Sequence, residues 1–130
     1  MYQHPGKRPV FISLIKIRFP VNAWLSAGHR ISGVMLFIAL LGYLSLINLL
    51  LLNDSVTLDS IRTHWILLSL HTGFWIAMSF HWLTGLRHLM AEHFTAEKHY
   101  QRINSPQVSQ LLLISWAFLS SAIFYQVWWL

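Results

Sequence analysis

Long apolar runs free of charge mark the first candidate membrane span. The run from Ile31 to Leu52 contains no charged residue. It is long enough to cross a hydrocarbon core of about 30 Å at about 1.5 Å per residue. We expect the helix to begin earlier, near Asn22, because Pro20 disfavours helix just before it and Asn22 can act as the cap. The first span is therefore predicted over residues 22–52.

Two further apolar stretches follow, each separated from its neighbour by a polar segment. The second, residues 64–90, is less purely apolar because it carries histidines and an arginine. A charged segment leads from it to the third stretch, residues 107–130, which is uncharged. Ser105 and Pro106 suit the cap and the first position of that last helix. The pattern thus predicts three transmembrane helices at about 22–52, 64–90 and 107–130.

The composition supports a membrane protein over a soluble one. Charged residues make up only 10% of the chain and hydrophobic residues 55%, whereas a soluble domain carries about 25% charge. We expect an all-α integral membrane domain over residues 22–130, preceded by a cytoplasmic or interfacial segment, residues 1–21. The polar residues of the third helix are all uncharged, among them Ser115, Ser120, Ser121 and Gln126. Such helices usually join partner helices, so we expect part of a heteromeric helix bundle.

The distribution of basic residues predicts the orientation. Lysines and arginines gather before the first span and between the second and third, and the loop between the first two spans holds only Arg62. The positive-inside rule then places the N-terminus in the cytoplasm and the C-terminus in the periplasm. We attribute the net charge of +5 to the basic loops that orient the helices in the membrane. Nucleic acid is therefore not expected as a partner. The first twenty residues form no signal peptide, which favours a multi-pass protein of a bacterial inner membrane.

One candidate site lies near the start of the first helix. Ser26, His29, Arg30 and Gly33 are three, four and seven residues apart, so they share one helix face. A hydroxyl and a guanidinium on one face can together bind a carbonyl oxygen or an anionic headgroup. The alternative is an arginine that extends to lipid phosphate beside a small packing serine.

A second candidate site lies on the second helix. His81 and His88 are seven residues apart and therefore lie nearly on one stripe, with Gly85 between them. A histidine at membrane depth can ligate haem iron, and a glycine one turn away would let the flat macrocycle approach the backbone. The alternative is a buried hydrogen bond to another helix. The role of His71 is left open.

The histidines limit how a haem could be held. The third helix has none, so the only candidate second ligand on another helix is His29. If two histidines hold the iron, the second is therefore expected from another subunit. Other chemistries are weakly supported, because the four acidic residues lie in loops or at helix ends and the chain has no cysteine.

Two sequence motifs are notable. The first combines Arg8-Pro9 and Leu14 with the run Ser26-Ala27-Gly28-His29-Arg30-Ile31-Ser32. The second is the run His81-Trp82-Leu83-Thr84-Gly85-Leu86-Arg87-His88-Leu89 in the second helix. In this order the two motifs resemble those of the cytochrome b membrane-anchor subunits of succinate dehydrogenase. The positions after the second motif depart from that family, with Ala91 and Phe94 around a retained acid, Glu92.

The resemblance implies a role in electron transfer to quinone. It implies His81 as an axial ligand of a haem b shared with a second hydrophobic anchor subunit. It places His29 and Arg30 near the haem propionates, and Ser26 and Arg30 at a ubiquinone site. It also implies a flavoprotein and an iron–sulfur subunit as partners, so the chain would serve an enzyme without itself oxidising succinate. The alternatives are the anchor of a related quinol-linked enzyme such as fumarate reductase, or a haem-free scaffold.

Overall fold

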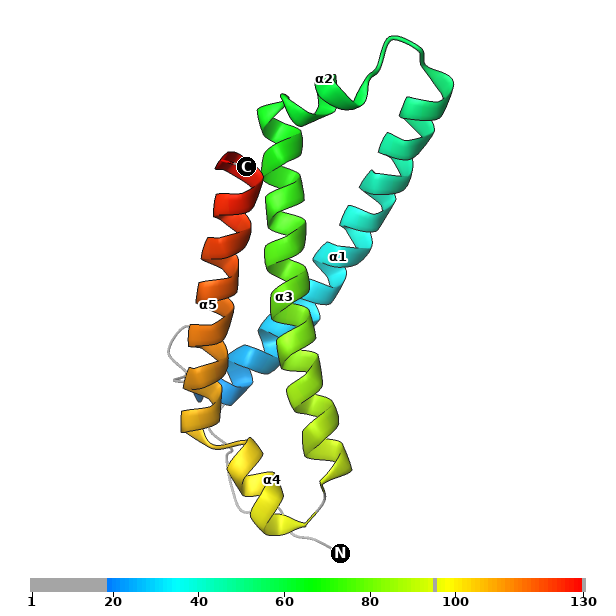
Figure 1. Cartoon of the computed structure of the whole chain (residues 1–130). Coiled ribbons are helices and arrows are strands. Elements are labelled where there is room, and N and C mark those ends of the chain that lie inside the picture. Colours follow the sequence, from blue (N-terminus) through cyan, green and yellow to red (C-terminus); the bar gives the residue numbers. More distant parts are fainter. Residues whose placement is uncertain (1–18, 95, 130) are drawn as a thin grey trace, which may run out of the picture.

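The computed structural model describes residues 19–94 and 96–129. Regular structure in these residues is entirely helical, which confirms the all-α prediction. The predicted N-terminal segment, with Arg8, Pro9 and Leu14, lies outside the described residues except at its last positions. The helices, drawn in Figure 1, are α1 (Val21–Leu52), α2 (Leu58–Arg62), α3 (Trp65–His93), α4 (Glu97–Ile103) and α5 (Pro106–Trp129).

Three of these helices are long and apolar enough to cross a membrane, as the sequence predicts. Their most apolar windows have mean hydropathies of 2.5 for α1, 1.3 for α3 and 1.6 for α5. Large apolar side chains cover their outer faces, among them Leu52 at 78% and Phe118 at 75% exposure. Surfaces of this kind suit lipid or other helices, and the chain is therefore an all-α, multi-pass membrane protein.

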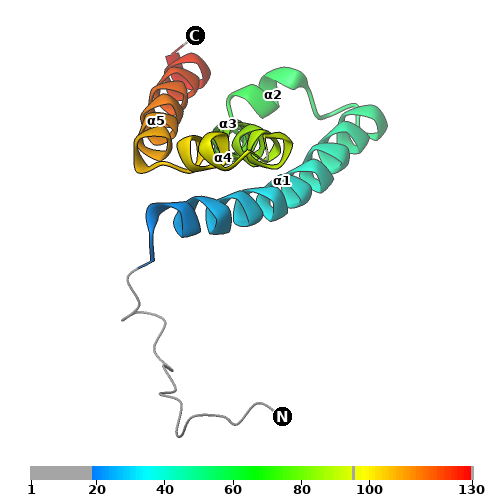
Figure 2. The ribbon, with the colours of Figure 1, turned by 90° about the horizontal axis from the view of Figure 1, so that it is seen from below.

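The three long helices form a bundle with α3 at its centre. Helix α3 packs against both α1 and α5, whereas α1 and α5 make few contacts with each other. Viewed along the bundle, α3 lies between its two neighbours (Figure 2). Helix α1 crosses α3 obliquely and diverges from it toward the end that carries α2 (Figure 1). We call this the α2 end, and the opposite end, where α1 and α5 begin, the α4 end.

The predicted start is correct for α5, whereas the predicted cap is wrong for α1. Helix α5 begins at Pro106 as predicted, and the Ser105 hydroxyl accepts a hydrogen bond from the Val108 N–H at 3.4 Å. The cap predicted at Asn22 is wrong. Pro20 occupies the N-cap position without a side-chain hydrogen bond, and Asn22 lies inside the first turn of α1.

The two short helices lie where the sequence indicated only polar connections. Helix α2 is stabilised by a capping box in which Thr57 and Ser60 satisfy each other's backbone N–H groups. Helix α4 ends at Ile103, with Asn104 as its C-cap, and Ala96 at its start provides no side-chain cap. Both are too short for an apolar period to show in the sequence.

A buried arginine fastens the helices together at the α4 end. Arg87 on α3 is only 6% exposed. Its Nη2 donates to Asn22 Oδ1 at 2.8 Å and to Asn104 Oδ1 at 3.0 Å, and its Nε donates to the Ile103 carbonyl at 3.3 Å. The Ser109 hydroxyl donates to the same Asn22 oxygen at 2.6 Å. This network joins α1, α3, α4 and α5. It therefore holds α1 against α3 at the α4 end, next to the point where the two helices cross.

Candidate functional site

Two of the predicted site histidines meet where α1 crosses α3. The rings of His29 and His81 stack with centroids 4.0 Å apart and planes 10° from parallel. His88, on α3 toward the α4 end, presents its ring edgewise to His29 at 5.3 Å. The structure thus brings together the two stripes that the sequence identified separately on the first and second membrane helices.

The hydrogen bonds of His81 determine which ring nitrogen carries the proton. Its Nδ1 lies 3.1 Å from the His29 carbonyl oxygen and 3.1 Å from Ser32 Oγ. A carbonyl can only accept a hydrogen bond, so Nδ1 must be the protonated nitrogen. Ser32 gives its own proton to the same His29 carbonyl at 2.8 Å and therefore accepts from Nδ1. In the neutral ring, Nε2 keeps its lone pair for a ligand.

His29 is held in the same way from the opposite helix. Its Nδ1 lies 2.8 Å from Thr84 Oγ1. The Thr84 hydroxyl donates to the Phe80 carbonyl at 2.7 Å, so it has only lone pairs left for His29. The Nδ1 of His29 is therefore also the protonated nitrogen.

Two glycines allow the rings to lie this close to the opposite helices. A Cβ atom at Gly33 would come within 3.1 Å of His81 Cε1, and one at Gly85 within 3.1 Å of His29 Cε1. Both are tighter than ordinary van der Waals contact. The sequence predicted that the backbone at Gly85 would be open to a flat macrocycle. Instead the His29 ring covers this position.

The stacking excludes one way of holding a haem. An axial imidazole points its lone pair at the iron within the plane of its own ring, and the two axial ligands lie on opposite sides of the iron. Two rings stacked face to face at 4.0 Å cannot do this. In this arrangement His29 and His81 are not the two axial ligands of one iron. The second ligand from another subunit stays a prediction.

The donor set fits a single axial ligand to haem iron. The Nδ1–H of His81 is bonded to a backbone carbonyl, the arrangement that metal-ligating histidines usually show. Within the described residues, no group of three or more histidine, cysteine or acidic side chains could hold a free metal ion.

The predicted quinone-site residues lie on α1 beside this histidine pair. Arg30 is exposed and Ser26 is half-buried. They are four residues apart and so lie on one face, one turn from each other. Neither side chain makes a hydrogen bond to another described residue, so both remain available to a molecule outside this chain.

The open question of His71 is answered by its hydrogen bonds. Its Nδ1 lies 2.6 Å from Tyr43 Oη on α1. Its Nε2 accepts a hydrogen bond from the Trp75 indole N–H at 3.1 Å, so Nδ1 carries the proton and donates to Tyr43. Both ring nitrogens are used, and His71 is a link between helices with no lone pair left for a metal.

Four other histidines lie in the described part of the chain: His64, His88, His93 and His99. His64, His93 and His99 are exposed, as expected for solvated side chains, and His4 lies outside the described residues. His88 is half-buried and lines a pocket of about 410 Å³ at the α4 end, together with Ala91, Glu92, Tyr100 and Asn104.

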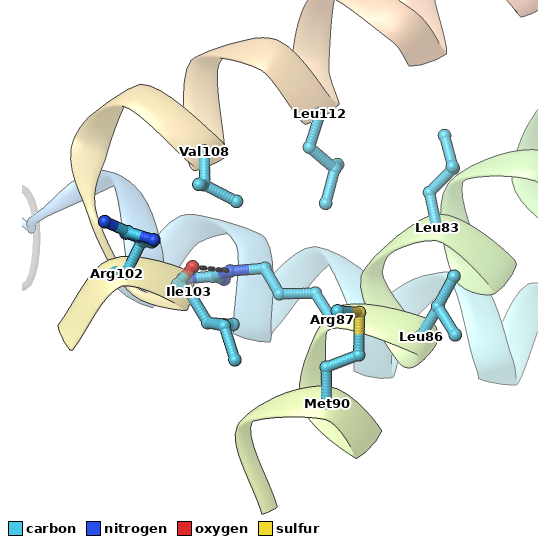
Figure 3. Close-up of a pocket in the computed structure, with 8 residues that line it drawn as sticks. All are labelled: Leu83, Leu86, Arg87, Met90, Arg102, Ile103, Val108 and Leu112. Carbon is cyan, nitrogen blue, oxygen red and sulfur yellow. Dashed lines mark hydrogen bonds between the residues drawn. The ribbon is translucent and has the colours of Figure 1, made fainter. Parts of the chain in front are cut away.

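A second pocket, of about 320 Å³, lies between α3, α4 and α5 and contains none of the predicted site residues. Figure 3 shows its walls of aliphatic side chains, with the Arg87 stem crossing toward Ile103. A structural role for Arg87 was not predicted from the sequence. An arginine inside an apolar span is itself the signal that could have revealed it, since a buried charge needs several hydrogen-bond partners. The lining residues are Leu83, Leu86, Arg87, Met90, Arg102, Ile103, Val108 and Leu112.

Comparisons with known proteins give a consistent result. Residues 5–121 match the family described as succinate dehydrogenase/fumarate reductase transmembrane subunit. A relative from Coxiella burnetii (strain RSA 493 / Nine Mile phase I), the succinate dehydrogenase cytochrome b556 subunit, is 41% identical over 92 residues. That alignment covers 65% of this chain and 70% of the relative.

Proposed function

The chain belongs to the succinate dehydrogenase/fumarate reductase transmembrane subunit family, and we propose that it is the haem-binding anchor of a succinate:quinone oxidoreductase. Family membership makes it a membrane subunit of an oxidoreductase complex. The name of the Coxiella burnetii relative supports the succinate-oxidising enzyme over a fumarate reductase. As an anchor, it does not itself oxidise succinate, which is the task of a soluble flavoprotein partner.

The single observation that carries the haem proposal is the state of the His81 ring. Its Nδ1–H is bonded to the His29 carbonyl and Ser32, and Nε2 remains for iron. A haem b bound there would supply a one-electron carrier inside the membrane. The second axial ligand would come from a second hydrophobic anchor subunit. His29 and Arg30 would lie near the propionates, where the cationic side chain of Arg30 favours carboxylates.

The quinone proposal rests on Ser26 and Arg30. Ubiquinone would bind at the α4 end, where electrons arrive from an iron–sulfur partner subunit. Ser26 would hydrogen-bond the quinone, and Arg30 would stabilise negative charge as it develops on a quinone oxygen. Both side chains are free of other bonds within the described part of the chain, as a substrate site requires.

The proposed setting is a bacterial inner membrane, with the α4 end toward the cytoplasm and the C-terminus in the periplasm. The basic residues Lys98 and Arg102 lie in or beside α4, whereas the α2 connection carries only Arg62. This asymmetry supports the orientation. The flavoprotein and iron–sulfur subunits would then dock at the α4 end, close to the proposed quinone site.

The test uses the whole complex, purified in mild detergent through a tag on this chain. Succinate oxidation is measured with a soluble dye and with ubiquinone. We expect Arg30→Ala to retain dye reduction and to lose quinone reduction by about tenfold or more, since a hydrogen bond to a charged group contributes about 1.5–3 kcal/mol.

The matched control is Arg62→Ala, an exposed arginine at the α2 end. It should leave both activities unchanged. Normal quinone reduction in Arg30→Ala would overturn the quinone assignment. A tagged chain that brings down no succinate-oxidising activity would overturn the anchor proposal itself.

A further inference from the structure

The two helices that carry the site contain the same five-residue pattern. The first copy is residues 29–33 of α1 and the second is residues 81–85 of α3. Each begins with histidine, has a hydroxyl residue three positions later and ends in glycine. We call them the paired motifs. Their sequences are His29-Arg30-Ile31-Ser32-Gly33 and His81-Trp82-Leu83-Thr84-Gly85.

The paired motifs contact each other reciprocally. The α1 hydroxyl, Ser32, bonds the α3 histidine, and the α3 hydroxyl, Thr84, bonds the α1 histidine. The glycines follow the same rule, since the His81 ring lies against Gly33 and the His29 ring against Gly85. Helices α1 and α3 run in opposite directions (Figure 1), so an approximate local two-fold axis passes between the stacked rings.

Burial makes the hydroxyl contacts hard to replace. Ser32 is 5% exposed and Thr84 only 1%. Water therefore has little access to take the place of either hydroxyl beside a ring nitrogen. The Ser32 hydroxyl has two roles. It donates its proton to the His29 carbonyl of its own helix, and its lone pairs accept a hydrogen bond from His81 on α3.

We propose that Ser32 is a positioning residue for the haem ligand His81. It accepts a hydrogen bond from Nδ1–H, fixes the ring orientation across the helix crossing, and increases electron donation from Nε2 to iron. Partners of this kind raise the basicity of a ligating imidazole. A more basic ligand favours ferric iron over ferrous iron, so Ser32 lowers the haem reduction potential. This inference rests on the proposed binding of haem at His81.

The experiment measures the haem midpoint potential and the low-spin electron paramagnetic resonance (EPR) signal in the purified complex. Ser32→Ala removes one oxygen atom and leaves the His29 carbonyl as the sole partner of Nδ1. We expect the midpoint potential to rise and the low-spin signal to broaden, because the ring gains rotational freedom. Haem content and the melting temperature of the complex should remain near wild type.

Ser79 provides a matched control on α3. Its hydroxyl donates to the Ile76 carbonyl at 2.9 Å, three residues back, as Ser32 donates to His29 at 2.8 Å. Ser79 has no bond to a histidine within the described residues. Ser79→Ala should therefore leave both the potential and the EPR signal unchanged. An equal shift in Ser79→Ala would show a nonspecific effect of serine removal and overturn the proposal.

A nearly isosteric pair separates hydrogen bonding from packing. Ser32→Thr keeps the hydroxyl and Ser32→Val replaces it with a methyl group of similar size. We expect Thr to retain the wild-type potential more closely than Val does. Equal potentials in the two variants, or no shift in Ser32→Ala, would overturn the role of Ser32. A wild-type complex without haem would instead overturn the proposed function on which the inference rests.

Discussion

Two histidines of α3 face the same helix and differ in whether the second ring nitrogen has a hydrogen-bond partner. His81 and His71 each use Nδ1 to reach α1, at the His29 carbonyl and Ser32 in one case and at Tyr43 in the other. The second nitrogen of His71 is taken by the Trp75 indole at 3.1 Å. No such donor faces Nε2 of His81 among the described residues. Both are half-buried at membrane depth, so neither residue type nor burial distinguishes them.

The difference indicates which of the two intramembrane histidines keeps a ring nitrogen available to a ligand. A polar side chain in a membrane must be satisfied, and both rings are tied to the neighbouring helix for that reason. Only the ring that is satisfied through one nitrogen retains a lone pair. His71 therefore links α1 to α3 where the two helices diverge, and His81 is left able to act as a ligand where they cross.

The largest expected effect comes from removing each ring in turn. His81→Ala should abolish the six-coordinate, low-spin haem spectrum, leaving either no haem or a five-coordinate haem that binds carbon monoxide. His71→Ala should leave the spectrum at wild type. Absorption and EPR spectra of the two purified complexes check this directly. A low-spin haem that survives His81→Ala but not His71→Ala would reverse the assignment.

Glycine replacement sharpens the same comparison with a smaller change. A Cβ at Gly33 meets His81 at 3.1 Å, whereas one at Gly42, near Tyr43 on the same helix, meets nothing within 4 Å. We expect Gly33→Ala to displace the His81 ring and to lower haem occupancy or broaden its EPR signal. Gly42→Ala should leave the haem unchanged. Haem per mole of complex is the measurement, and equal behaviour of the two variants would contradict the close packing described for the paired motifs.

The smallest expected effect is on stability alone. Tyr43→Phe removes the hydroxyl that accepts from His71 and leaves that Nδ1–H without its partner. We expect a loss of about 1 kcal/mol in stability, the usual contribution of a side-chain hydrogen bond. The melting temperature should fall slightly while the haem potential stays constant. A changed potential would show that the His71 link is coupled to the haem site.

Hydropathy alone was sufficient to predict the three long helices, because each carries an uncharged or nearly uncharged apolar run. The exact ends of the helices were harder to predict from the sequence. Asn22 is a good cap residue, but Pro20 takes the cap position and Asn22 bonds Arg87 instead. That bond joins residues far apart in sequence, and no local pattern reports it.

The candidate site residues could be identified from the sequence, but the contacts between them could not. The His-x-x-Ser/Thr-Gly pattern is visible twice in the sequence at 29–33 and 81–85. Reciprocal pairing of the two copies depends on the depth at which α1 and α3 cross, and apolar runs this long permit many registers. For the same reason, the sequence does not reveal that Tyr43 and Trp75 occupy both ring nitrogens of His71.

We propose that this chain is a b-type cytochrome subunit of a succinate-oxidising complex. Its most direct test is a succinate-reduced minus oxidised visible spectrum of the complex, purified in mild detergent through a tag on this chain. We expect a b-type α-band with succinate, of nearly the same size as the band with dithionite. No band with either reductant would contradict the claim. A band with dithionite but none with succinate would retain the cytochrome and contradict its link to succinate.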